Sequence, residues 1–221
     1  MRSISDNLRI SMVISRLFPN RVIHTGLFTA ILFSAAVIGP GPAAGTENIN
    51  QIIDGSGRTV QAVESDTRIE FVAPLDGNPL TREWFHSGKA GYNISGPGAE
   101  NFRGKIVIGY QVGYPASFDG RLKFEWMTPD LGVSIGGSSP GITVNSLLPR
   151  AGVEMELGFG PGIVDVDCAT GSISGSTGFI QLSAVHASVT GAVGSINIRP
   201  YVTVISETGD TVVAYGPATS H

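Results

Sequence analysis

The feature that most limits what this chain can fold into is a period-two alternation of apolar and polar residues across positions 121–159. In Arg121–Met127 (RLKFEWM) the odd positions are mostly charged and the even positions hold Leu, Phe and Trp. The alternation continues after residues 128–129 (TP) with its parity reversed, and it returns in residues 153–157 (VEMEL). Alternation of this kind is typical of β-strands with one apolar face. It predicts a long β-hairpin whose other face is polar.

The strands of this predicted hairpin are unusually long. The fifteen residues from Arg121 to Ile135 would extend about 50 Å before twist and tilt. A hydrocarbon layer is about 30 Å thick, so the hairpin is long enough to cross one. A single hairpin would leave unpaired backbone groups in lipid. Several copies from several chains could instead close a barrel.

The rest of the chain after residue 45 predicts many short strands. Glycine is abundant at 30 residues, and charged residues make up 14% of the chain against about 25% in ordinary soluble domains. Glycine-rich and proline-rich turns separate the segments, and 208–210 (TGD) is a strong hairpin signal. The sequence predicts an all-β sandwich or barrel, with further strands at 58–63, 68–73, 105–112, 172–174, 179–190, 195–206 and 211–215.

Residues 1–45 form a separate segment. Four arginines precede an apolar run at 27–38 (LFTAILFSAAVI), and small residues with Gly and Pro follow it. A basic start, a short apolar region and a small-residue end are typical of a secretory signal peptide. Twelve apolar residues are too few for a membrane-spanning helix, which needs about 20. Without this segment the chain is more acidic than its overall net charge of −4, which argues against nucleic acid as a partner.

No catalytic, metal-binding or cofactor-binding motif emerges from the sequence. Cys168 is the single cysteine, so no disulfide can form within the chain, and we interpret it as a buried thiol. His86 and His186 lack ligands at metal-binding spacing. Ser138 and Ser139 lack a nucleophile elbow and are interpreted as turn residues. We therefore expect neither an enzyme nor a cofactor.

Several motifs resemble one known family across residues 46–221. They include LTREWFHSG (80–88), GYQVGYP (109–115), GFGPGI (158–163) and TGD (208–210). These motifs occur in the same order in the MspA family of mycobacterial outer-membrane porins. The resemblance implies an exported subunit that forms an octamer in the mycolic-acid outer membrane, either with itself or with a related porin subunit. Its channel would pass ions and small hydrophilic solutes by passive diffusion.

The resemblance also implies a division of the chain and a set of site residues. Residues 46–120 and 160–221 would form a β-sandwich rim, and 121–159 a transmembrane hairpin contributed to a shared barrel. The pore constriction would comprise Ser134, Ile135, Gly136, Gly137, Ser138 and Ser139. The lumen would be lined by Arg121, Lys123, Glu125, Asp130, Glu154 and Glu156. The outer-membrane lipids would contact Leu122, Phe124, Trp126, Leu131, Val133, Val153, Met155 and Leu157.

The constriction departs from the family pattern. Adjacent aspartates stand there in the family's best-known member, whereas this chain has Ser134, Ile135 and Gly137 at the matched positions. The remaining lumen charges are weakly acidic, so we expect a weak cation preference. Two other classes remain open: a secreted soluble β-sandwich binding module without a pore, and a cell-wall enzyme. The binding module predicts that its own chain covers the apolar face of the hairpin.

Overall fold

The computed structural model describes residues 47–127, 132–134, 142–146, 150–156 and 159–221. Side chains are described for 47–126, 154–156 and 159–221. The proposed signal peptide therefore lies outside the described residues. No helix in these ranges is long and apolar enough to cross a membrane.

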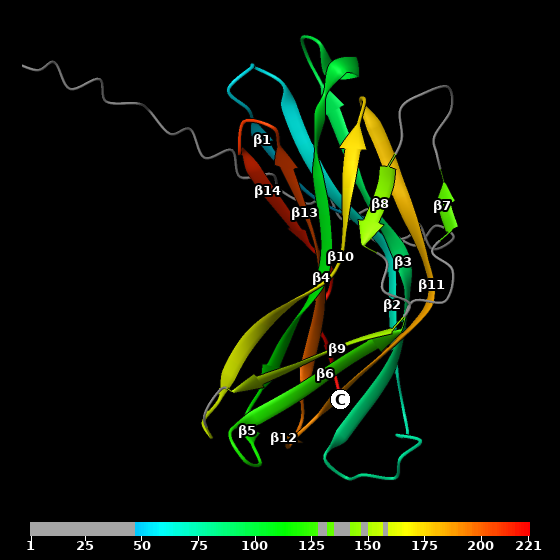
Figure 1. The fold of residues 1–221 in the computed structure, drawn as a ribbon, viewed down its shortest axis with the longest axis vertical. Coiled ribbons are helices and arrows are strands. Elements are labelled where there is room, and N and C mark those ends of the chain that lie inside the picture. Colours follow the sequence, from blue (N-terminus) through cyan, green and yellow to red (C-terminus); the bar gives the residue numbers. More distant parts are fainter. Residues whose placement is uncertain (1–46, 128–131, 135–141, 147–149, 157–158) are drawn as a thin grey trace, which may run out of the picture. The chain divides into compact units, whose positions relative to one another are not determined.

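The described chain is built almost wholly from antiparallel strands (Figure 1). One short 3₁₀ helix, η1 (Ala99–Asn101), interrupts them. The strands are β1 (Glu47–Ile53), β2 (Thr59–Val72), β3 (Thr81–Ser95), β4 (Arg103–Tyr114), β5 (Ala116–Ser117), β6 (Arg121–Met127), β7 (Gly132–Ser134), β8 (Ile142–Ser146), β9 (Arg150–Glu156), β10 (Gly162–Ser174), β11 (Thr177–Thr190), β12 (Ala192–Val193), β13 (Asn197–Ser206), β14 (Thr211–Tyr215) and β15 (Thr219–Ser220).

These strands form two main sheets. Sheet A has the order β1-β2-β3-β11-β6-β9, with β7 also paired to β11. Sheet B has the order β14-β13-β4-β10-β8, with β15 paired to β13. On one side the edges of the two sheets meet, because Asn50 Nδ2 on β1 donates to the Val213 carbonyl on β14 at 2.9 Å. The expected all-β sandwich is confirmed.

The inward faces of the sheets enclose two apolar clusters. Cluster one is built around Tyr92, Phe102 and Ile106, and cluster two around Trp84 and Phe124. Alternate residues of the strands enter them, as in β2, where Val60 and Ala62 are buried. Each large apolar side chain buried in this way contributes about 1.5–3 kcal/mol to folding.

Sheet A bends sharply at one level. A bulge in β2 places residues 66 and 67 opposite the single residue Gly88 of β3, and a bulge in β11 places residues 183 and 184 opposite the single residue Ser87. Among the described residues, Asp66 (φ 56°) and Ala184 (φ 50°) are the non-glycine residues with a left-handed backbone. One lies in each bulge. Bulges bend and twist the strands that contain them, so β2 and β11 change direction on either side of β3.

Expectations about several individual strands were wrong, among them β1, which was not expected, and β10 (Gly162–Ser174), of which only 172–174 was expected. The expected strands at 58–63 and 68–73 are one strand, β2, which runs through its bulge without ending. Strand β3 was missed because it lies in the interior of sheet A and has buried residues on both faces between 90 and 92. A central strand of this kind lacks the clean alternation by which strands are recognised.

The expected single long hairpin is found only where β6 pairs with β9. Strand β6 pairs with β9, from Arg121 opposite Glu156 to Met127 opposite Arg150. Beyond that point β7 joins sheet A beside β11, whereas β8 joins sheet B beside β10. The expected pairing of these two segments with one another is therefore wrong. Each of these short strands pairs instead with a longer strand, β11 or β10.

Candidate functional site

The charged face of the ribbon formed by β6 and β9 is the first candidate site. In β6, Arg121, Lys123 and Glu125 alternate with buried residues and point to the opposite face, and Glu154 and Glu156 lie beside them on β9. All five carry substantial exposed surface, from 40% for the Glu125 side chain to 80% for Glu156. The predicted grouping of these five charges on one face of a ribbon is what the structure shows.

Ion pairs cross this face. Arg121 Nη1 lies 3.5 Å from Glu154 Oε1, and Arg121 Nη2 lies 3.3 Å from Glu156 Oε1. Lys123 Nζ lies 3.1 Å from Glu125 Oε1. Exposed pairs of this kind contribute about 0–1 kcal/mol to stability. The ion pairs matter more for the electrostatic field of this face, because two cations offset most of the negative charge of three carboxylates.

The opposite face of the ribbon is covered by its own chain. Leu122 and Phe124 are 0% exposed and Trp126 is 6% exposed, and all three belong to cluster two. The Phe124 ring centroid lies 5.7 Å from that of Trp84 and 5.9 Å from that of Tyr110. Within the described subunit, Leu122, Phe124 and Trp126 are therefore packed against their own chain, and the lipid contact expected for them stays a prediction. Alternation predicts an apolar face correctly, but it cannot tell whether lipid or protein covers that face.

The other predicted site residues are described in part or not at all. Met155 is half-buried and packs against cluster two. Only the backbone is described for Val133, Ser134 and Val153. The remaining ones lie outside the described residues: Asp130, Leu131, Ile135, Gly136, Gly137, Ser138, Ser139 and Leu157.

Open strand edges lie next to the charged face. In the part of the chain that the structure describes, β9 pairs with β6 and has no partner on its outer edge. Strand β10 pairs with β8 through Thr170–Ile173, and its residues 162–168 have no described neighbour on that side. Unpaired edges readily pair with another chain. Sequence reasoning did not locate them, because strand order is set by long-range pairing.

Exposed apolar residues gather where the ribbon begins. Phe118, Phe159 and Ile163 are 68%, 70% and 71% exposed, and Val193 is also exposed. Backbone hydrogen bonds tie this region together: Ser117 N donates to Phe159 O at 3.3 Å, and Phe118 N donates to Gly191 O at 2.8 Å. We call Phe118, Phe159, Ile163 and Val193 the apolar collar. The sequence does not indicate the collar, because its members come from three separate stretches of the chain, two of which include short or terminal parts of β10 and β12.

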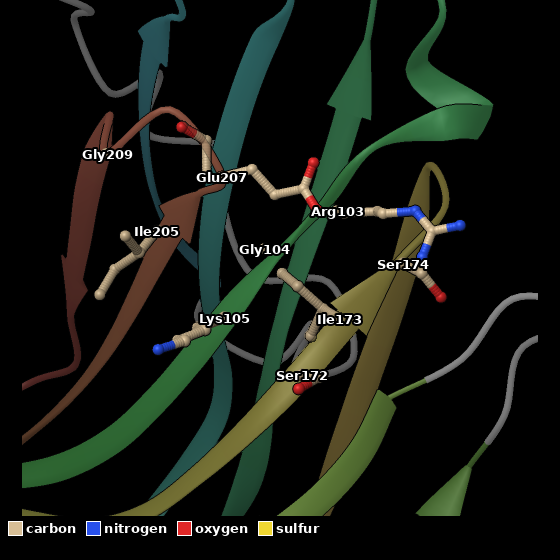
Figure 2. Close-up of a pocket in the computed structure, with 10 residues that line it drawn as sticks. Arg103, Gly104, Lys105, Ser172, Ile173, Ser174, Ile205, Glu207 and Gly209 are labelled. Carbon is tan, nitrogen blue, oxygen red and sulfur yellow. The ribbon is translucent and has the colours of Figure 1, made fainter.

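A shallow groove on sheet B offers no comparable chemistry. It is lined by β4, β10 and the end of β13, and Figure 2 shows the Arg103 and Lys105 side chains extending in different directions. Glu207 adds an opposite charge to the same groove. The polar groups therefore do not converge on one point.

The described residues include neither a metal cluster nor a reactive thiol. No group of three or more His, Cys, Asp and Glu side chains among them could hold a metal ion. The thiol of Cys168 is held mostly out of solvent, and burial raises its pKa, followed in importance by the nearby Asp167 carboxylate. A thiol with a raised pKa is a poor nucleophile.

Comparison with known proteins assigns the family. The MspA family model matches residues 56–220. Porin MspD of Mycolicibacterium smegmatis is 40% identical over 194 residues, covering 85% of this chain and 93% of the relative. Porins MspB and MspA of the same organism are each 40% identical over 179 residues, covering 78% of this chain and 83% and 85% of those relatives. The chain therefore belongs to the MspA family.

Proposed function

We propose that this chain is the subunit of an outer-membrane porin, a water-filled oligomeric channel for passive diffusion of ions and small hydrophilic solutes. Membership of the MspA family carries this proposal, since the relatives compared above are named porins. The resemblance of the motifs implies export and an octameric ring in the mycolic-acid outer membrane. A related subunit could replace some copies in that ring.

The open edge of β9 supports assembly through the ribbon. A strand with an unpaired edge can extend its sheet into a neighbouring copy, and repetition around a ring closes a barrel without edges. The charged face of β6 and β9 would then line the shared lumen. Its exposed carboxylates and cations suit contact with water.

The apolar collar supports a revised lipid contact. Because Leu122, Phe124 and Trp126 pack inside their own chain, the membrane needs another apolar surface. Phe118 and Phe159 are aromatic and exposed, and aromatic residues are enriched at the membrane interfaces of β-barrels. We assign the membrane boundary to the collar in place of Trp126.

The lumen charges support a weak cation preference. Each chain presents three carboxylates, Glu125, Glu154 and Glu156, against Arg121 and Lys123, and most of them are paired. Rings of charge set ion selectivity in channels. A net excess of one carboxylate per subunit favours cations, but more weakly than an unpaired acidic ring would.

Planar-bilayer recording of the purified oligomer tests the proposal. We expect stepwise conductance and a reversal potential that favours cations in a salt gradient. The double substitution Glu154→Gln with Glu156→Gln should shift the reversal potential toward anions. Glu100→Gln, on the exposed η1 turn, is the matched control and should leave it unchanged. Absence of stepwise openings would overturn the porin assignment; an unchanged reversal potential in the double variant would overturn the lumen assignment alone.

One observation favours a second candidate, a secreted soluble β-sandwich binding module. That class predicts an apolar ribbon face covered by its own chain, as found for Leu122 and Phe124. Extraction separates the two. A porin requires detergent and runs as a heat-resistant oligomer, whereas a binding module is released in buffer as a monomer.

A further inference from the structure

A buried polar group lies at the bend of sheet A, between the two apolar clusters. Glu64 on β2 and His86 on β3 both have fully buried side chains. Glu64 Oε1 lies 3.8 Å from His86 Nε2. Thr67 Oγ1, inside the β2 bulge, donates to Glu64 Oε1 at 3.0 Å, and His86 Nδ1 lies 2.9 Å from the Tyr110 hydroxyl. We call Glu64, Thr67, His86 and Tyr110 the waist network.

Two polar atoms of this network lack partners. Glu64 Oε2 and His86 Nε2 are buried and have no hydrogen-bond partner among the described residues. A buried polar atom without a partner costs about 1–3 kcal/mol. One proton on Glu64 Oε1 would give His86 Nε2 a partner, because a carboxylic acid can donate to a neutral imidazole nitrogen, and Oε1 could still accept from Thr67. The same proton removes the buried negative charge that Glu64 Oε2 would otherwise share without a partner. A relaxation of about 1 Å would bring the two groups to hydrogen-bond distance.

The network lies where the backbone is least regular. The bulge at 65–68 faces residues 87–89 and the bulge at 182–185 faces residues 86–88, and each contains a left-handed residue, Asp66 or Ala184. Such residues cost about 1–3 kcal/mol each and persist only where their surroundings fix them. The waist network is the polar contact that joins β2, β3 and β4 at this level.

We propose that Glu64 and His86 hold one shared proton that locks the bend of sheet A, which makes the junction between the two apolar clusters a pH-sensitive hinge. With one proton the buried pair is neutral overall. Loss of that proton leaves a buried carboxylate, and gain of a second leaves a buried imidazolium. Either unpaired charge is costly in an apolar interior.

No charged neighbour among the described residues shifts the pKa of Glu64 or His86. Tyr110 on β4 contacts His86, and Cys168 on β10 lies close enough to affect Tyr110; burial raises the pKa of both, so they stay neutral. Sheet A contributes Val185 from β11, and Gly216, after β14, closes over Glu64, since a Cβ there would lie 3.2 Å from Glu64 Cγ. The nearby ion pair between Lys89 and Asp66 is about half exposed, on the outer face.

The pKa values give the direction of the pH effect. Burial raises the pKa of Glu64 from 4.5 to about 8, although the Thr67 hydrogen bond opposes this, and burial lowers the pKa of His86 from 6.5 to about 4. A raised acid pKa means that stability is lost as pH rises from about 5 to about 8. A lowered histidine pKa means that the stability of the folded bend is lost as pH falls from about 6.5 to about 4. The free energy needed to open the hinge should be highest near pH 5–6.

Amide hydrogen exchange on the purified full-length protein tests the hinge. We expect the opening of segments 64–68 and 183–187, corrected for intrinsic exchange, to increase between pH 5.5 and 8.5 by up to about tenfold per pH unit. Glu64→Gln should abolish this increase, because the amide cannot ionise. Glu83→Gln is the matched control, since Glu83 pairs with His186 at 2.7 Å on the outer face, and it should retain the increase.

A second measurement needs no variant. Infrared spectra of the wild-type protein should show the C=O absorption of a protonated carboxylic acid at pH 6 that disappears as pH passes 8. Equal pH dependence in Glu64→Gln and wild type would overturn the proposal. So would the absence of an acid C=O absorption at pH 6. Neither result depends on channel activity, so the hinge and the porin assignment can fail separately.

Discussion

Replacement of Phe124 by alanine tests whether the ribbon belongs to the core of its own subunit. The Phe124 ring is fully buried and lies within 6 Å of the ring centroids of Trp84, Tyr110 and Trp126. Removing a buried phenylalanine costs its transfer free energy, about 1.5–3 kcal/mol, plus the cost of the cavity left behind. The sum for Phe→Ala substitutions in packed cores is about 3–5 kcal/mol. We expect a loss in this range, because rigid aromatic neighbours on several sides cannot collapse into the space.

Equilibrium unfolding in guanidinium, followed by far-ultraviolet circular dichroism, measures this loss on the purified full chain. Lys123→Ala is the matched control, one residue away on the exposed face and paired with Glu125; it should cost no more than about 1 kcal/mol. If Phe124 faced lipid, its replacement would hardly change the free energy of unfolding of the subunit. A loss below about 1 kcal/mol in Phe124→Ala would refute the packing described above.

Two further substitutions test separate parts of the structure. Gly109→Ala should destabilise the fold by about 1–3 kcal/mol, because its Cβ would lie 2.3 Å from the Val166 carbonyl oxygen; thermal unfolding measures this. Gly113→Ala is its control, since the nearest atom would be 3.6 Å away, and equal losses in both variants would contradict the steric argument. Arg121→Gln should increase the cation preference, since it frees Glu154 and Glu156 from their partner. Reversal potentials measure the change; an equal shift in Arg103→Gln, at the sheet B groove, would show that position in the lumen is irrelevant.

Local chemistry made several elements predictable. The hairpin at 208–210 joins β13 and β14 as expected, and Gly209 there has φ 90°. The turn that precedes β6 contains Gly120, whose φ is 78°. Turns of this kind depend on a few adjacent residues, so the sequence alone locates them. The separation of charged and apolar residues in β6 was equally predictable, because it needs only the two-residue period.

Long-range pairing was not predictable from the same patterns. Strand β11 lies between β3 and β6. It is separated along the chain from β3 by about a hundred residues and from β6 by about sixty. Whether Leu122 and Phe124 face lipid or protein depends on that placement. The Glu64 and His86 pair was also invisible, since the two residues are on different strands and neither stands in a recognisable motif. What the alternation predicts is a face, and the tertiary fold decides what covers it.

The packing of cluster two gives the protein a built-in optical probe. The chain has two tryptophans, Trp84 and Trp126, and both lie against Phe124, with ring centroids 5.7 Å from it. Indole fluorescence shifts to longer wavelength when water reaches the ring. Emission from the unlabelled protein would therefore report whether the β6 segment stays seated on the sandwich when subunits meet a membrane.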